Sequence, residues 1–167
     1  MNTKSKILIR SSFSFIILFF MGVWGVHAQD SLHVMLPNGW ALTPAGKHIE
    51  LGDLPLNMAS SLDGRWLAVT NNGYGRQSID LIDTKHETKV SSTTIPKSWY
   101  GLAFSRNGRT LYASAGNDNQ IKIYYVERDG SLNLSDSIVM GKPWPERISP
   151  AGLVVHPRKQ ELYVVTR

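Results

Sequence analysis

The chain has 167 residues, no cysteine and a formal net charge of +5. Residues 1–28 hold three of the 18 basic side chains and no acidic one, so the rest of the chain carries 15 basic against 13 acidic side chains, a net charge of +2. This weak excess does not indicate a nucleic-acid-binding surface, which requires clustered lysine and arginine. Without cysteine the chain forms no disulfide and offers no thiol for a lipid anchor.

The first 28 residues have the pattern of a secretory signal peptide. Three basic residues precede an apolar stretch from Phe13 to Val26, and Val26-His27-Ala28 fits the small-x-small rule for cleavage. An uncleaved membrane anchor is the alternative, but a bilayer span needs about 20 apolar residues, more than this stretch provides. We therefore expect cleavage, no stable membrane insertion afterwards, and a periplasmic or extracellular location.

The rest of the chain contains a repeat of short predicted strands. The run Asp-Gly-Arg-Trp-Leu-Ala-Val from Asp63 to Val69 returns 44 residues later as Asn-Gly-Arg-Thr-Leu-Tyr-Ala from Asn107 to Ala113. A weaker third copy lies between Leu153 and Val164. Repeats of about 40 to 50 residues made of short strands are typical of β-propeller blades. The sequence therefore predicts an all-β fold of propeller blades.

The strand signals divide the chain after the signal peptide into four parts. Residues 29–54 are expected to supply an outer hairpin, with strands at 40–43 and 47–51, that completes a terminal blade. Residues 55–96 and 97–141 each predict a blade, and residues 142–167 predict the start of a next blade. In the last two parts the expected strands are 100–105, 110–115, 120–127, 131–140, 151–156 and 161–166. We expect about three blades' worth of four-stranded antiparallel sheet, the N-terminal part of a propeller whose ring cannot close with these residues alone.

Blade connectivity predicts a shared loop face. Successive antiparallel strands alternate in direction, so the loop between the second and third strands of a blade lies at the same end as the connection to the next blade. Loops on rigid scaffolds carry function more often than strands do. The candidate ligand-binding residues on this face are Asn71, Asn72, Tyr74, Lys97, Trp99, Tyr100, Asn117, Asp118, Lys142 and Trp144. The alternative is structural: the tryptophans would wedge between blades, and the asparagines would shape their own turns.

No catalytic or metal-binding constellation stands out in the sequence. The histidines are scattered singly, unlike zinc ligands, and Asn117-Asp118-Asn119 has too few carboxylates for a calcium loop. No arrangement of serine, histidine and acid favours nucleophilic catalysis. We therefore expect no catalytic residue, cofactor or metal site in these residues.

Several motifs resemble one known family. The most specific are Trp-Tyr-Gly-Leu-Ala-Phe from Trp99 to Phe104 and Gly-Lys-Pro-Trp-Pro from Gly141 to Pro145. With residues 36–40, 54–59, 69–73, 116–119 and 148–153, they resemble the YncE-like, lactonase-type seven-bladed β-propeller family. The resemblance covers nearly the whole chain after the signal peptide. It is most specific to a branch of exported bacterial proteins in which an alkaline-phosphatase-type phosphoesterase domain follows the propeller, and it places any catalytic metal in that downstream domain.

The leading hypothesis for function is a non-catalytic exported propeller module. It would bind a small molecule or a protein, and would position the downstream phosphoesterase domain of the same chain. The fold alone does not select the ligand. One alternative is a lactonase-type hydrolase, which needs polar side chains from several blades at the central opening of the ring. The other is a structural cell-surface repeat protein without a downstream catalytic domain.

The signal peptide gives a first testable prediction. Exported protein should begin at Gln29, because the small residues Val26 and Ala28 precede that bond. N-terminal sequencing of exported material checks the position. A protein that begins at Met1, or that stays in the membrane after a carbonate wash, would contradict cleavage.

Overall fold

The computed structural model describes residues 34–42, 46–143 and 145–167. The chain divides into two units, Met1–Gly46 and Lys47–Arg167. The signal peptide lies outside the described residues. Within the described part of the chain, no helix has the length and apolar character to cross a membrane.

The described part of the first unit is a small hairpin. Strands β1 (Val34–Met35) and β2 (Ala41–Leu42) pair antiparallel. The turn between them is tight because Gly39 adopts a left-handed conformation (φ +81°) and the Asn38 side chain accepts a hydrogen bond from the Trp40 amide at 3.0 Å. The expected pairing of 40–43 with 47–51 is therefore wrong: β2 pairs upstream, and 47–51 forms no strand.

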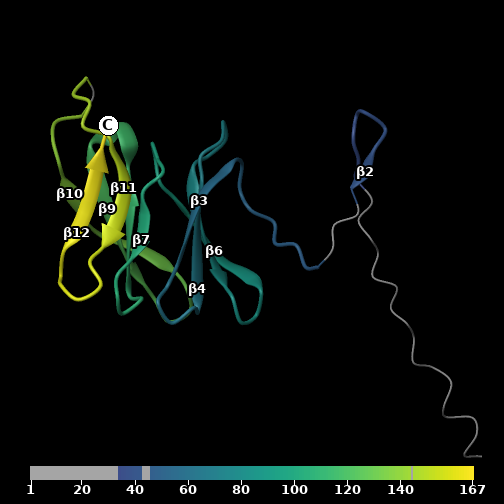
Figure 1. The fold of residues 1–167 in the computed structure, drawn as a ribbon, viewed down its shortest axis with the longest axis horizontal. Coiled ribbons are helices and arrows are strands. Elements are labelled where there is room, and N and C mark those ends of the chain that lie inside the picture. The colour runs from purple at the N-terminus through teal and green to yellow at the C-terminus, as the bar shows by residue number, and fades with distance from the viewer. Residues whose placement is uncertain (1–33, 43–45, 144) are drawn as a thin grey trace, which may run out of the picture. The chain divides into compact units, whose positions relative to one another are not determined.

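The second unit consists of three antiparallel sheets (Figure 1). Their strands pair in chain order, so each sheet is a meander of hairpins. The first sheet contains β3 (Pro55–Ser60), β4 (Trp66–Asn71), β5 (Ser78–Asp83) and β6 (Thr88–Thr94). The second contains β7 (Leu102–Phe104), β8 (Thr110–Ser114), β9 (Gln120–Val126) and β10 (Leu132–Val139), and the third contains β11 (Pro150–Val155) and β12 (Leu162–Thr166). The strands predicted from residue 55 onward are confirmed.

The sequence repeat corresponds to the turn between the first two strands of a sheet. Asp63 accepts hydrogen bonds from the Ser61 hydroxyl at 2.6 Å and the Arg65 amide at 3.1 Å. Asn107 takes the place of Asp63 in the second sheet and accepts from the Arg109 amide at 3.0 Å. The glycine that follows in each copy has a φ near +70°, which a residue without Cβ adopts at least cost. The repeat thus encodes a turn with its own side-chain cap.

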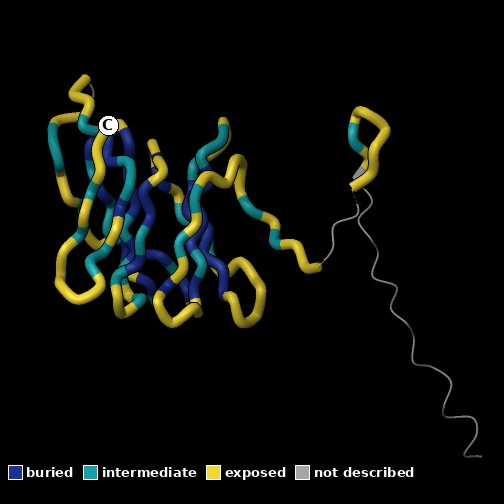
Figure 2. Tube along the Cα trace, in the orientation of Figure 1, coloured by how far each residue is buried: buried dark blue, intermediate teal, exposed yellow. Residues whose placement is uncertain are grey.

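The main core lies between the first and second sheets. Trp66, Ile79 and Leu81 from the first sheet pack against Leu111 and Tyr124 from the second, and all five are buried. Figure 2 shows the buried residues concentrated in the middle strands of the sheets. Burial raises the pKa of Tyr124 to about 12, so its phenol stays neutral within the core.

The sheets are closest at their first strands. β7 lies against both β3 and β11, whereas the fourth strands β6 and β10 touch less extensively. The three sheets of this unit therefore fan outward from the side on which β3, β7 and β11 lie. This arrangement places the loops of successive sheets next to one another at both ends of the strands.

Residues 47–54 form a strap over the first sheet instead of a strand. The Gly52 backbone amide donates to a carboxylate oxygen of Asp80 at 3.1 Å. The Asn72 backbone amide donates to the Leu54 carbonyl at 3.0 Å. Asp80 alternates with the core residues Ile79 and Leu81, so it faces the opposite side of the sheet. Its buried carboxylate also accepts from the Ser92 hydroxyl at 2.6 Å. The Lys89 ammonium lies 3.6 Å from the same carboxylate, so the strap amide is one of three groups that satisfy this buried charge.

Candidate binding face

The loops predicted to share one face do so in the second unit. We call this surface the loop face; it comprises residues 71–77, 96–100, 115–119, 141–143 and 145–148, and it lies uppermost in Figure 1. The Asn72 side chain donates to the Ser98 carbonyl at 2.7 Å, and the Trp99 amide donates to the Ser114 carbonyl at 3.2 Å. The first bond joins the 71–77 loop to the connection between the blades, and the second joins that connection to the end of β8, which agrees with the predicted grouping.

One buried asparagine organises the longest connection. The side-chain nitrogen of Asn119 donates to the carbonyls of Lys142 at 2.5 Å and Glu146 at 2.9 Å. Its side-chain oxygen accepts from the amides of Ile148 at 3.2 Å and Ser149 at 2.8 Å. The whole hydrogen-bonding capacity of this amide side chain therefore goes to one loop. Sequence reasoning assigned Asn119 no role of its own.

The structure gives a local reason for an asparagine at position 119. It follows the short 3-10 helix η2 (Gly116–Asp118) and precedes β9, at a position with φ +53°. Asparagine is one of the few residues that adopts this left-handed conformation at low cost. The backbone requirement and the polar side chain together identify Asn119 as a loop-anchoring residue.

The asparagines predicted to contact a ligand mainly make hydrogen bonds to other residues of the protein. Asn71 is fully buried, and its side-chain nitrogen donates to the Ser78 hydroxyl at 3.0 Å. The oxygen of Asn117 accepts from the Ser149 hydroxyl at 3.0 Å. Asn72 and Asn117 thus bond to segments distant in the sequence and not to their own turns. Their contact with a ligand remains a prediction.

The predicted charged residues differ in their surroundings. Lys97 lies 2.6 Å from an Asp118 carboxylate oxygen, and both side chains are partly exposed. Such an exposed pair contributes roughly 0 to 1 kcal/mol, so it orients the two side chains more than it stabilises the fold. The Lys142 side chain is exposed, and its amide donates to a carboxylate oxygen of Glu146 at 2.7 Å.

Aromatic side chains supply the exposed apolar surface of this face. Tyr74 is fully exposed at the tip of its loop, whereas Trp99 is 42% exposed and Tyr100 is 50% exposed. Trp99 packs in part against Gly116, where an added Cβ would lie 3.3 Å from the Trp99 Cβ. The Trp99 side chain is therefore partly packed against the loop and partly exposed to solvent. Trp144 lies outside the described residues.

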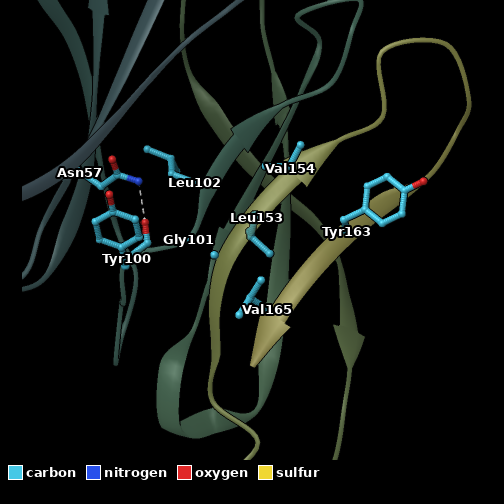
Figure 3. A pocket seen from close by; sticks show the side chains of 9 residues that line it. Asn57, Tyr100, Gly101, Leu102, Leu153, Val154, Tyr163 and Val165 are labelled. Carbon is cyan, nitrogen blue, oxygen red and sulfur yellow. Dashed lines mark hydrogen bonds between the residues drawn. The ribbon is translucent and has the colours of Figure 1, made fainter. Parts of the chain in front are cut away.

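Tyr100 also lines a groove of about 240 Å³ along the first strands (Figure 3). The groove continues over Leu102 and Leu153 to Tyr163 and Val165. The only amide side chain in its lining is that of Asn57, which donates to the Tyr100 carbonyl at 2.7 Å. The lining is mostly apolar, so it offers surface for a planar or aliphatic group.

A wider groove of about 1050 Å³ lies at the opposite end of the strands. It is lined by the turn residues 105–107 and 158–161, together with Tyr112 and Ile123. None of the ten predicted site residues lines it. In the described part of the chain, no group of three or more histidine, cysteine or acidic side chains could hold a metal ion.

Comparisons with known proteins identify the fold. No model of a known protein family matches the chain, and no curated protein matches it significantly. Among solved structures, hydrazine synthase of Kuenenia stuttgartiensis matches 74% of the chain with a TM-score of 0.54 at 19% identity. A protein from Lactobacillus plantarum matches 71% of the chain with a TM-score of 0.55 at 17% identity. The chain covers 32% and 36% of these two structures, about a third of their length.

The chain is built of β-propeller blades. The neighbours are propellers, and the first and second sheets have the four antiparallel strands of a blade. The third sheet contributes two strands of another blade. A gluconolactonase from Xanthomonas campestris also matches 75% of the chain at 19% identity, with a TM-score of 0.46 and 40% of its own length covered.

The four hydrogen bonds of Asn119 give the second prediction. Replacing Asn119 with Ala should leave four backbone groups between residues 142 and 149 without this partner, of which the buried Ser149 amide should cost about 1 to 3 kcal/mol. Amide hydrogen exchange in that segment should accelerate, while exchange in the core strands β4 and β8 stays slow. Hydrogen-exchange mass spectrometry of the full-length protein measures both.

The matched control is Asn133→Ala, which removes an exposed asparagine that bonds only to Glu127 among the described side chains. It should leave exchange in residues 142–149 unchanged. Equal protection of that segment in both variants would show that Asn119 does not hold the connection.

Proposed function

We propose that this chain is part of an exported β-propeller module that binds a small molecule or a protein at its loop face. Tyr74, Trp99 and Lys142 would make the contacts, with Tyr100 at the border between this face and the groove of Figure 3. In the full-length protein the module would also position a downstream phosphoesterase domain. The signal-peptide pattern supports export to the periplasm or the extracellular space.

The observation that carries this proposal is the combination of exposed aromatic rings with anchored loops. Tyr74 and Trp99 expose apolar surface to solvent. The segments that carry them are bonded to each other, because Asn72 holds the carbonyl of Ser98. Aromatic residues on a pre-formed surface bind with little loss of conformational entropy. Exposed rings on a rigid face are therefore better suited to binding than to packing.

The chemistry of the groove favours binding over hydrolysis. A lactonase-type hydrolase would need acidic or basic groups from several blades near the first strands. The groove is instead lined by aliphatic and aromatic side chains and one amide, that of Asn57. At its rim, the Tyr163 hydroxyl donates to a carboxylate oxygen of Glu161 at 2.9 Å, which raises the pKa of Tyr163. That phenol is thus held protonated and is a poor general base.

The link to a phosphoesterase rests on the family resemblance of the Trp99–Phe104 and Gly141–Pro145 motifs. Both motifs contribute residues to the loop face. A propeller that presents a binding face beside a hydrolase domain would bring substrates or partners to it. The metal and the nucleophile of that reaction would belong to the downstream domain.

The third prediction separates binding from packing at Trp99. A panel of nucleosides, sugars and their phosphates is screened against the full-length protein by thermal shift, and the strongest binder is measured by calorimetry. Trp99→Ala and Tyr74→Ala should each weaken binding by about 1 to 3 kcal/mol, as for exposed interface aromatics. The unfolding midpoint should change little.

Tyr125→Ala is the matched control, because Tyr125 is also 42% exposed and lies on β9, away from the loop face. It should change neither the affinity nor the midpoint. A large fall in the midpoint of Trp99→Ala with unchanged affinity would identify Trp99 as a packing residue and overturn its binding role.

The fourth prediction concerns the downstream domain. The full-length exported protein should hydrolyse 4-nitrophenyl phosphate, and a chelator should abolish this activity. Trp99→Ala should leave turnover of this small substrate unchanged, because the propeller supplies no catalytic group. Release of 4-nitrophenolate, followed by its absorbance, measures the rate. A full-length protein without phosphatase activity under any divalent-metal condition would contradict the phosphoesterase link while leaving the binding role of the loop face open.

A further inference from the structure

Four buried side-chain oxygens near the base of the loop face lack hydrogen-bond partners within the described residues: those of Asn71, Asn72, Gln77 and Ser98. The Asn71 side chain lies against Gly52 of the strap, which leaves the oxygens of Asn72, Gln77 and Ser98 as a separate group. Ser98 is only 4% exposed. Burying a polar group without a partner costs about 1 to 3 kcal/mol, so a group of three such atoms needs a physical explanation.

The three atoms belong to two segments that are bonded to each other. The Asn72 side-chain nitrogen donates to the Ser98 carbonyl at 2.7 Å, and the Ile95 amide donates to the Gln77 carbonyl at 3.1 Å. The first of these bonds fixes the orientation of the Asn72 amide, because only its nitrogen can donate to a carbonyl. The oxygen of Asn72 is therefore an acceptor that needs a donor.

The second blade shows how such an acceptor is satisfied by the chain itself. There Asn119 also donates to carbonyls of the following connection, and its oxygen accepts the amides of Ile148 and Ser149. The first blade has a shorter connection, residues 95–101 between β6 and β7, and no amide in it bonds the oxygen of Asn72. Asn72 follows β4, whereas Asn119 precedes β9 as Gln77 precedes β5, so the two blades place the asparagine at opposite ends of the loop and complete its hydrogen bonds differently.

We propose that a single buried water molecule completes this junction in the first blade. It would donate to the side-chain oxygens of Asn72 and Gln77 and accept from the Ser98 hydroxyl. Three bonds to otherwise unsatisfied groups are typical of buried water. The inference does not depend on whether the loop face binds a ligand.

The chemistry of the three atoms favours water over a metal ion. Calcium takes six to eight oxygen ligands, usually including carboxylates, and the three oxygens here are neutral. The nearby carboxylate of Asp118 is paired with Lys97. A water molecule, in contrast, supplies both the donors that the amide oxygens need and an acceptor for the hydroxyl.

This water would connect the loop that carries Tyr74 with the connection that carries Trp99. Two hydrogen bonds already join residues 72–77 to residues 95–98, from the Asn72 side chain to the Ser98 carbonyl and from the Ile95 amide to the Gln77 carbonyl. A bridging water at the same place adds bonds between the two segments without side-chain packing. It is thus a positioning element for the exposed aromatics.

The first test is a crystal structure of the full-length protein grown with a chelator. One ordered solvent peak should lie about 2.5 to 3.0 Å from each of the three oxygen atoms. A peak at about 2.3 to 2.6 Å with six or more oxygen ligands in calcium-containing crystals would indicate a cation instead. Direct bonding of the Ser98 hydroxyl to either amide oxygen, with no solvent peak, would also overturn the proposal.

The second test uses Gln77→Met, which removes the acceptor and keeps the side-chain length. If water occupies the site, the variant leaves it short of one bond, and amide exchange in residues 95–98 should be roughly tenfold faster, as for a lost buried hydrogen bond. If the site is dry, the variant removes an unsatisfied acceptor, and exchange should be unchanged or slower.

Gln160→Met, at an exposed glutamine, is the matched control and should leave exchange in residues 95–98 unchanged. Ser98→Ala gives an independent reading, because it removes the hydroxyl donor without altering the carbonyl that Asn72 holds. It should accelerate exchange in the same segment. Unchanged exchange in both Gln77→Met and Ser98→Ala would overturn the proposal.

Discussion

The second unit depends on apolar burial between the first and second blades. Ile79, Leu81 and Leu111 are fully buried there, and fully burying an aliphatic side chain of this size contributes about 1.5 to 3 kcal/mol. The contact requires the two sheets to stand face to face, with their strands running in the same directions. Once that packing is set, the loops at each end are brought together whatever their sequences. The position of the loop face is therefore a consequence of the core, and side-chain hydrogen bonds such as those of Asn119 then order its loops.

The contacts between neighbouring blades differ at the two ends of the strands. At the end opposite the loop face, the turns are short and pack closely: Gly130 has a φ of +87°, and an added Cβ there would lie 3.0 Å from the Trp66 ring. The Arg65 guanidinium lies over the Trp66 ring at 4.3 Å and donates to the Arg128 carbonyl at 2.8 Å. At the loop face Gly116 also packs closely, since an added Cβ there would lie 2.8 Å from the Lys97 carbonyl oxygen, but side-chain amides join the longer segments. Tyr74 and Trp99 stay exposed beside them, which favours this end as the surface for a ligand.

Most of the blade architecture could be predicted from the sequence, and the reasons are local. Asp63-Gly64 and Asn107-Gly108 encode the same capped turn, and alternation of apolar residues marks the strands on either side. The hairpin at 40–51 could not be predicted in the same way. Whether 40–43 pairs with 34–35 or with 47–51 depends on which of two turns forms. It also depends on the Asp80 carboxylate, 28 residues from Gly52 in the sequence, which accepts a hydrogen bond from the Gly52 amide. Long-range polar contacts of this kind leave no periodic signal.

The candidate site shows the same division between local and long-range information. The sequence identified which loops meet, because strand direction alone determines it, and it placed the exposed Tyr74 and the half-exposed Trp99 on them. It did not distinguish asparagines that face solvent from those that hold a neighbouring segment. Asn119 bonds to residues 23 to 30 positions downstream, and only the folded arrangement brings these groups within reach. The asparagine-rich loops therefore form the frame of the proposed binding face, and the exposed aromatic side chains are its proposed contact surface.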